Sequence, residues 1–255
     1  MEAIQHDSPE AWERHWSAYD EATRRNPAHR FRRRLIFKAL ELCPRSLHIL
    51  DLGCGQGEFL REARERFPGA ELAGVDFSAT GLELARQRVP GARLFQTDFS
   101  SSEPLPRELE GFANSVVCSE VLEHLDDPRL VLRKVAPALA LGGRLLITVP
   151  GGPRSAFDIH IGHRRHYSPR ELASLLRSAG YAPIAVRGAG FPFFNLYKMV
   201  VLLRGKRLAQ DLDQAQPISR LGLFAMATFD RLFALNSNAT GFGWQTFGIF
   251  RLARD

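Results

Sequence analysis

The spacing of apolar residues predicts a chain of alternating strands and helices. Short apolar runs, typical of buried strands, end at polar residues, and amphipathic segments follow the early runs. Ile49 and Leu50 close the first run, and Asp51 ends it. Residues 58–67 then show a helical pattern, whose apolar face consists of Phe59, Leu60, Ala63 and Phe67. This strand and helix form the first of several repeated units.

Six further strands are expected, at residues 71–75, 93–96, 115–118, 144–149, 181–186 and 245–252. Helical patterns separate the early ones, and this alternation indicates a parallel, doubly wound α/β sheet. The last strand follows a long insertion, residues 190–241. With 255 residues, of which 45% are apolar, the chain is expected to form a single domain around one sizeable core.

Two helices are predicted before the first strand, within residues 8–42. Ser8 and Pro9 are a helix-start signal, and Asn26 followed by Pro27 starts the second helix. This leading segment would either cover a ligand pocket as a lid or pack against the edge of the sheet.

Charge and cysteine content narrow the class of protein. The net charge is +6, and arginines cluster within residues 24–34. Such a cluster would bind nucleic acid or an anionic membrane, or form an ordinary solvated helix face. The three cysteines lack paired spacing, which disfavours disulfides and a cysteine-based zinc site. The sequence shows neither an apolar leader nor a run of roughly 18 apolar residues. A cytoplasmic location of the protein is therefore expected.

A glycine turn follows the first strand. Gly53, Gly55 and Gly57 occupy alternating positions, two residues after Asp51. A strand, a glycine turn and a helix let backbone N–H groups approach a nucleotide-like ligand, because a Cβ would block that approach. The G-x-G-x-G spacing departs from the dinucleotide pattern G-x-G-x-x-G, which disfavours a nicotinamide dehydrogenase.

This stretch resembles motif I of the class I S-adenosylmethionine (SAM) dependent methyltransferases, and residues 45–187 follow that family well. The resemblance implies a Rossmann-like fold with seven strands in the order 3-2-1-4-5-7-6, the last antiparallel, and SAM as cofactor. It divides the chain into an N-terminal helical lid (1–44), a SAM-binding core (45–190), a helical substrate cap (191–240) and a last strand (241–255).

The ends of the next strands carry candidate cofactor contacts. Asp76 lies 19 residues after Gly57, where an acid typically accepts from both ribose hydroxyls. By resemblance, Asp98 accepts from the adenine amino group. Each acid alone is also an ordinary helix N-cap. The expected cofactor-binding set is Asp51, Gly53, Gly55, Gly57, Asp76, Phe77, Asp98, Phe99 and Ser119.

A second cluster suggests the chemistry. Glu120, Glu123 and His124 would share one face of a helix after the fourth strand, because they are spaced i, i+3 and i+4. The pattern is similar to the Glu-x-x-Glu-His helix of the small-RNA 2′-O-methyltransferases and of the ubiquinone-pathway O-methyltransferases, which implies a divalent metal (Mg, Mn or Zn). The candidate ligands are Glu120, Glu123, His124 and, from a later loop, His163. Such a metal would hold two neighbouring oxygens of a diol or catechol.

A metal-free reaction is the alternative. His163 would then act as general base, since its unperturbed pKa suits neutral pH. The candidate catalytic residues under either mechanism are His163, His124 and Glu120. Arg164 and Arg165 would bind an anionic group of the substrate or would simply be solvated.

The insertion before the last strand is strongly apolar and contains Arg204, Lys206 and Arg207. It predicts a pocket for a lipophilic or lipid-linked acceptor, a membrane-surface contact through residues 191–235, a helical cap packed on the sheet, or a homodimer interface. The sequence therefore predicts a SAM-dependent O-methyltransferase acting on a small or lipid-linked acceptor. The alternatives are a metal-dependent RNA 2′-O-methyltransferase, although nucleic acid is a less expected partner, and a non-catalytic SAM-binding partner subunit.

Overall fold

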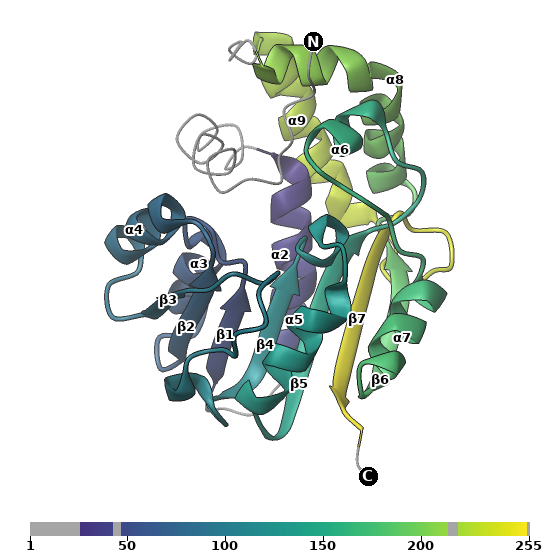
Figure 1. The fold of residues 1–255 in the computed structure, drawn as a ribbon. Helices are drawn as coiled ribbons and strands as arrows, with labels where there is room; N and C mark the ends of the chain where they lie inside the picture. Colours follow the sequence, from purple (N-terminus) through teal and green to yellow (C-terminus); the bar gives the residue numbers. More distant parts are fainter. Residues whose placement is uncertain (1–25, 43–46, 214–218, 254–255) are drawn as a thin grey trace.

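A seven-stranded sheet forms the centre of the computed structural model, which describes residues 26–42, 47–213 and 219–253 (Figure 1). The strand order is β3-β2-β1-β4-β5-β7-β6, and only β7 runs antiparallel to its neighbours. The seven predicted strands, their order and the antiparallel last strand are confirmed. The strands are β1 (His48–Leu52), β2 (Glu71–Asp76), β3 (Arg93–Gln96), β4 (Ala113–Ser119), β5 (Leu139–Pro150), β6 (Tyr181–Ala189) and β7 (Gln245–Leu252).

Helices cover both faces of the sheet (Figure 1). The α-helices are α2 (Pro27–Leu40), α3 (Glu58–Arg66), α4 (Ala79–Arg88), α5 (Pro128–Val135), α6 (Ala156–His160), α7 (Pro169–Ser178), α8 (Phe193–Asp213) and α9 (Arg220–Leu232). The described residues also form the short 3₁₀ helices η1 (Arg107–Leu109), η2 (Leu122–His124), η3 (Ala136–Ala138) and η4 (Phe233–Leu235).

The helix predicted after Asn26 is confirmed as α2. The Asn26 side chain accepts a hydrogen bond from the Ala28 N–H at 2.9 Å, and Pro27 occupies the first turn. The first predicted helix, which starts at Ser8, lies outside the described residues.

Successive residues of a strand pack into two different apolar cores, one on each face of the sheet. Leu50 belongs to the core that α5 and α7 cover, whereas its neighbour Ile49 belongs to the core beneath α2 and α3. Successive side chains of a strand point to opposite faces, so a parallel sheet covered on both sides is buried throughout. The short apolar runs of the sequence reflect this burial.

The fifth strand starts earlier than predicted. Leu139 already pairs with Ala113, and the register then shifts before Ser115 pairs with Arg144. Residues 141–143, which precede the strand predicted at 144–149, form this irregularity inside β5. Gly142 has a φ of 76°, which lets the chain kink without leaving the sheet.

The insertion forms α8 and α9, which lie beyond the carboxyl ends of the parallel strands together with α6 (Figure 1). An aromatic cluster fixes it to α2, with the Phe31 ring centroid 5.0 Å from Phe194 and 5.4 Å from Phe233. Among the described residues, no helix is long and apolar enough to cross a membrane.

Candidate functional site

The glycine turn after β1 is bonded to the end of β2. Gly53 and Cys54 donate their N–H groups to the Val75 carbonyl at 2.8 and 3.1 Å, and Gly55 donates to Asp76 Oδ2 at 2.8 Å. Gly53 has a φ of 72°, and a Cβ there would lie 2.6 Å from Val121 Cγ2. The turn therefore needs glycine both for its backbone conformation and for its close packing.

Two buried carboxyl groups flank this turn. Asp51 is 4% exposed and Asp76 is 5% exposed. Asp76 accepts from the N–H groups of Gly55 and Ser78, at 2.8 and 2.9 Å. Burial raises the pKa of Asp51 well above its usual value, and the charge of Asp76 raises it further. A cationic ligand would relieve this repulsion, so the pair fits the sulfonium and ammonium groups of SAM.

The remaining candidate cofactor residues lie at the same edge of the sheet. Asp98 accepts from the Ser100 N–H and hydroxyl at 2.8 and 2.6 Å, and the hydroxyl bond lowers the pKa of Asp98. Phe99 is buried, and Phe77 is half-buried. Ser119 shares a 2.8 Å hydrogen bond with the Thr148 hydroxyl. The ends of β1, β2, β3 and β4 thus place the predicted residues along one edge, although their individual roles stay predictions.

The predicted helix carrying Glu120, Glu123 and His124 is wrong. Glu120 follows β4 with a φ of 59°, and only a single 3₁₀ turn, η2, forms after it. The chain is extended again at Leu125, and α5 begins only after Asp127, which caps it. The i, i+3, i+4 spacing does not bring the three side chains onto one helix face, because the segment lacks a continuous helix.

Glu120 instead belongs to a hydrogen-bonded ring with α2 and β7. Its Oε2 lies 2.8 Å from Arg32 Nη2, and its Oε1 accepts from Gln245 Nε2 at 2.9 Å. Arg32 Nε donates to Gln245 Oε1 at 3.1 Å, which closes the ring. Gln245 was not among the residues predicted from the sequence, and Arg32 was predicted only as part of a charged cluster.

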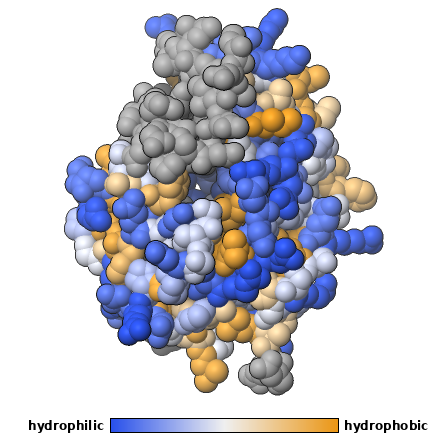
Figure 2. Space-filling view, viewed as in Figure 1, coloured by the Kyte–Doolittle hydropathy of each residue, from blue (hydrophilic) through white to orange (hydrophobic). Residues whose placement is uncertain are grey.

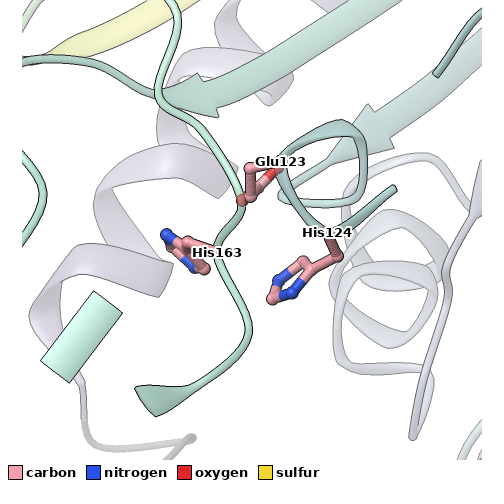
Figure 3. Close-up of side chains that lie close together, drawn as sticks. All are labelled: Glu123, His124 and His163. Atoms are coloured by element: carbon pink, nitrogen blue, oxygen red, sulfur yellow. The ribbon is translucent and has the colours of Figure 1, made fainter. Parts of the chain in front are cut away.

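Glu123, His124 and His163 do come together, as Figure 3 shows. Each offers a ligand atom, and these atoms lie within 4.8 Å of one another. The His124 and His163 ring centroids are 4.8 Å apart and perpendicular. Glu120 lies outside this trio, so three of the four predicted metal ligands converge.

The Glu123 carboxyl group is the unusual member. It is 0% exposed, and neither of its oxygens has a hydrogen-bond partner within the part of the chain that the structure describes. Burial raises the pKa of Glu123 well above its usual value, and the negative charge of Glu120 adds to this. A buried carboxylate without a partner is costly, so this position fits a neutral acid or a bound cation.

The loop histidines are held in place through Arg164. The Arg164 N–H donates to the Glu123 carbonyl and its Nε to the His124 carbonyl, both at 2.8 Å. Arg164 Nη1 also lies 2.6 Å from Asp126, and Arg165 donates to the Asp126 carbonyl at 2.9 Å. These contacts attach the loop that carries His163 to η2.

The trio fits a divalent metal in its chemistry. Burial lowers the pKa of His163 well below its usual value, and a neutral imidazole offers a lone pair. Two imidazoles and a carboxylate suit Zn²⁺ or Mn²⁺.

Comparisons with known proteins give the family. A profile described as a methyltransferase domain matches residues 19–186. The ubiquinone biosynthesis O-methyltransferase of Xanthomonas axonopodis pv. citri (strain 306) is 30% identical over 163 residues, which cover 58% of this chain and 67% of the relative. The protein of the same name from Bordetella avium (strain 197N) is 30% identical over 168 residues, covering 59% and 69%.

Solved structures share the fold. Phosphoethanolamine N-methyltransferase 2 of Haemonchus contortus, in complex with SAM, aligns with a TM-score of 0.57 at 19% identity. The alignment covers 87% of this chain but only 52% of that one. The chain belongs to the methyltransferase domain family and is a SAM-dependent methyltransferase. Its similarity to curated O-methyltransferases supports methyl transfer to oxygen.

Proposed function

We propose that the chain is a metal-assisted O-methyltransferase whose acceptor carries two neighbouring hydroxyl groups on a lipophilic body. The fully buried carboxyl group of Glu123 carries this proposal. It has no hydrogen-bond partner among the described residues, and one of its oxygens lies within 4.8 Å of a ring nitrogen of each of two imidazoles. Glu123, His124 and His163 would hold the ion. When bound, it would stabilise the negative charge of an acceptor oxygen that loses its proton.

The chain's own residues supply position. SAM provides an activated methyl group, which the glycine turn, Asp51 and Asp76 would hold. Gly53 packs against Val121, which lies two residues before Glu123. The glycine turn is therefore next to the trio of Glu123, His124 and His163. Alignment of the acceptor oxygen with the methyl group would account for much of the rate. Within the predicted lid, residues 1–44, the described residue Arg32 pairs with Glu120 beside the site, which supports a lid role for α2.

A metal-free mechanism is the second candidate, and the neutral, buried His163 favours it. Here the imidazole would accept the hydroxyl proton as general base while the methyl group transfers. Glu123 would then remain a neutral acid. The two mechanisms differ in whether an ion is needed.

Calorimetric titration of Mn²⁺ into the protein, with S-adenosylhomocysteine present, separates them. We expect one ion per chain in the wild type and binding at least 100-fold weaker in Glu123→Gln. Glu83→Gln, which changes an exposed acid on α4, is the matched control and should bind like the wild type. Failure of the wild type to bind Mn²⁺, Mg²⁺ or Zn²⁺ would overturn the metal and leave His163 as base.

The acceptor class needs its own assay. We would compare an alkyl-substituted catechol with its monohydroxy analogue and follow methylation by mass spectrometry. Metal-dependent O-methylation of the catechol alone is expected. Equal methylation of both compounds would contradict the two-hydroxyl requirement. Methylation of a short RNA instead would favour the RNA-terminal alternative.

We also propose that α8 contacts an anionic lipid surface and so brings a lipophilic acceptor to the site. Its exposed side chains include Leu196, Met199, Val200 and Leu203, at helical spacing. Apolar and hydrophilic surface lie side by side over this helix in Figure 2. Arg204, Lys206 and Arg207 supply charge complementary to anionic headgroups. A second copy of this chain is the competing occupant.

A further inference from the structure

A chain of hydrogen bonds runs behind His163, on the loop between α6 and α7. His166 Nδ1 lies 3.0 Å from the Gly152 carbonyl oxygen, and His166 Nε2 lies 3.2 Å from His163 Nδ1. The two rings are 5.4 Å apart, and His163 is 8% exposed. The nitrogen atoms that carry hydrogen in such a chain can be assigned from its fixed end.

The Gly152 carbonyl is that fixed end. A carbonyl oxygen can only accept, so the hydrogen of this contact must reside on His166 Nδ1. At pH 8 an unperturbed imidazole is neutral and has one N–H group. His166 Nε2 therefore carries a lone pair and accepts. It follows that the hydrogen between the rings belongs to His163 Nδ1.

Asp158 is the other group near His163 Nδ1, with its Oδ1 3.8 Å away. Both oxygens of this buried carboxylate are already engaged: Oδ1 accepts from Lys198 Nζ at 2.9 Å, and Oδ2 from the Ser155 N–H and hydroxyl at 2.7 Å each. Asp158 is thus an acceptor as well. At 3.8 Å, Asp158 is beyond hydrogen-bond distance of His163 Nδ1, whereas His166 Nε2, at 3.2 Å, is within it.

We propose that His166 is a positioning residue that fixes His163 as the Nδ1–H tautomer and leaves the lone pair on Nε2. The role of that lone pair, as metal ligand or as base, rests on the proposed function, whereas the tautomer does not. A ring nitrogen whose partner fixes the tautomer and orientation is a better ligand, and loss of such a partner typically weakens metal binding about 10- to 100-fold.

The test is ¹⁵N NMR of the histidine ring nitrogens at pH 8, on the full chain with a chelator and without cofactor. We expect His163 to show a protonated Nδ1 and an unprotonated Nε2. In His166→Phe this pattern should change to the Nε2–H form. In His166→Gln it should persist, since the amide oxygen can accept where Nε2 did.

His48→Gln, at the start of β1, is the control and should leave the His163 signals unchanged. An Nε2–H pattern in the wild type would overturn the proposal. Retention of Nδ1–H in His166→Phe would also overturn it, because Asp158 would then fix the tautomer. Should the Phe variant fail to fold, an Nε2–H pattern in the wild type or in His166→Gln would still overturn the proposal.

A second readout separates this inference from the proposed function. We expect Mn²⁺ binding to weaken at least tenfold in His166→Phe and to recover in His166→Gln. If the wild type binds no metal, the metal-assisted mechanism fails, while the NMR result still decides the tautomer. If the wild type binds metal and the Phe variant binds it equally well, the positioning role of His166 is contradicted.

Discussion

Arg32 is the residue through which α2 reaches the carboxyl edge of the sheet. Its guanidinium group bonds Glu120 through one nitrogen and Gln245 through another. A lysine would keep the charge but cannot make both contacts from a planar fork. We expect Arg32→Lys to lower the free energy of unfolding by about 1–2 kcal/mol, measured by urea denaturation.

Arg30→Lys is the matched control on the same helix. Arg30 pairs with Asp230 at 3.2 Å, but its side chain is 49% exposed. Surface ion pairs contribute about 0–1 kcal/mol, so this variant should remain near the wild type. An equal loss of unfolding free energy in the two variants would contradict a special role for the hydrogen bonds that join Arg32, Glu120 and Gln245.

Gly53 gives a second prediction at this scale. Alanine there would adopt a φ of 72° and would place its Cβ 2.6 Å from Val121 Cγ2. We expect Gly53→Ala to weaken S-adenosylhomocysteine binding at least tenfold by calorimetry and to cost about 1–3 kcal/mol of stability. Gly69→Ala, where a new Cβ would meet nothing within 4 Å, should bind normally.

Individual residues also show where prediction from sequence ends. Asp51 and Asp76 were predictable, because each lies within the last two residues of its strand and parallel strands end at one edge. Gln245 was not, since it lies 213 residues from Arg32 and only the fold brings the two together. Glu120 was misplaced because its left-handed backbone conformation has no sequence signal in a glutamate.

At the scale of elements, strands were easier to predict than the short helices around the site. The buried strands are short apolar runs with polar ends, whereas η2 is a single 3₁₀ turn between Glu120 and an extended Leu125. Helical spacing of Glu120, Glu123 and His124 therefore suggested a helix that does not exist. The sequence also identified α8 as apolar, but not which of its sides is exposed.

The exposed side of α8 gives the next prediction. Leu203 is 83% exposed and precedes Arg204, so both groups are available to an anionic lipid surface. We expect the wild type to bind phosphatidylglycerol-containing vesicles in sedimentation assays, and binding to weaken as salt rises. Leu203→Glu should reduce partitioning about tenfold or more, because apolar contact is lost and negative charge is added.

Leu141→Glu controls for the added charge. Leu141 is also fully exposed, at the start of β5, and the substitution changes net charge equally. Its vesicle binding should match the wild type. Equal loss in both variants would indicate a non-specific charge effect, and dimerisation lost only in Leu203→Glu would assign this face of α8 to a second copy of the chain.

For the whole molecule, the buried carboxyl groups at the carboxyl edge of the sheet lower the free energy of unfolding. The fold buries Asp51 beside Asp76, and it buries Glu123 without a hydrogen-bond partner among the described residues. Ligands that bind only the folded state offset such a cost by mass action. The cofactor-free protein should therefore become more stable when one of these charges is removed.

Asp51→Asn tests this as a function of pH. The pKa of Asp51 is raised in the folded state, so the wild type loses stability as pH rises from about 3.9, its unfolded value, through the folded pKa. Asparagine does not titrate. In urea denaturation without cofactor, the stability of Asp51→Asn relative to wild type should therefore increase with pH, by at most about 1.4 kcal/mol per unit.

The same variant should bind S-adenosylhomocysteine at least tenfold more weakly, since the carboxylate that destabilises the empty fold would attract the cofactor's cationic groups.

Asp98→Asn should show the opposite dependence of stability on pH, so its stability relative to wild type should decrease as pH rises. The Ser100 hydrogen bonds lower the pKa of Asp98, so its carboxylate stabilises the fold above about pH 3.9, and this contribution is lost as pH falls through the folded pKa. A difference between Asp51→Asn and wild type that does not vary with pH would show that Asp51 titrates normally, and the electrostatic cost would then lie elsewhere.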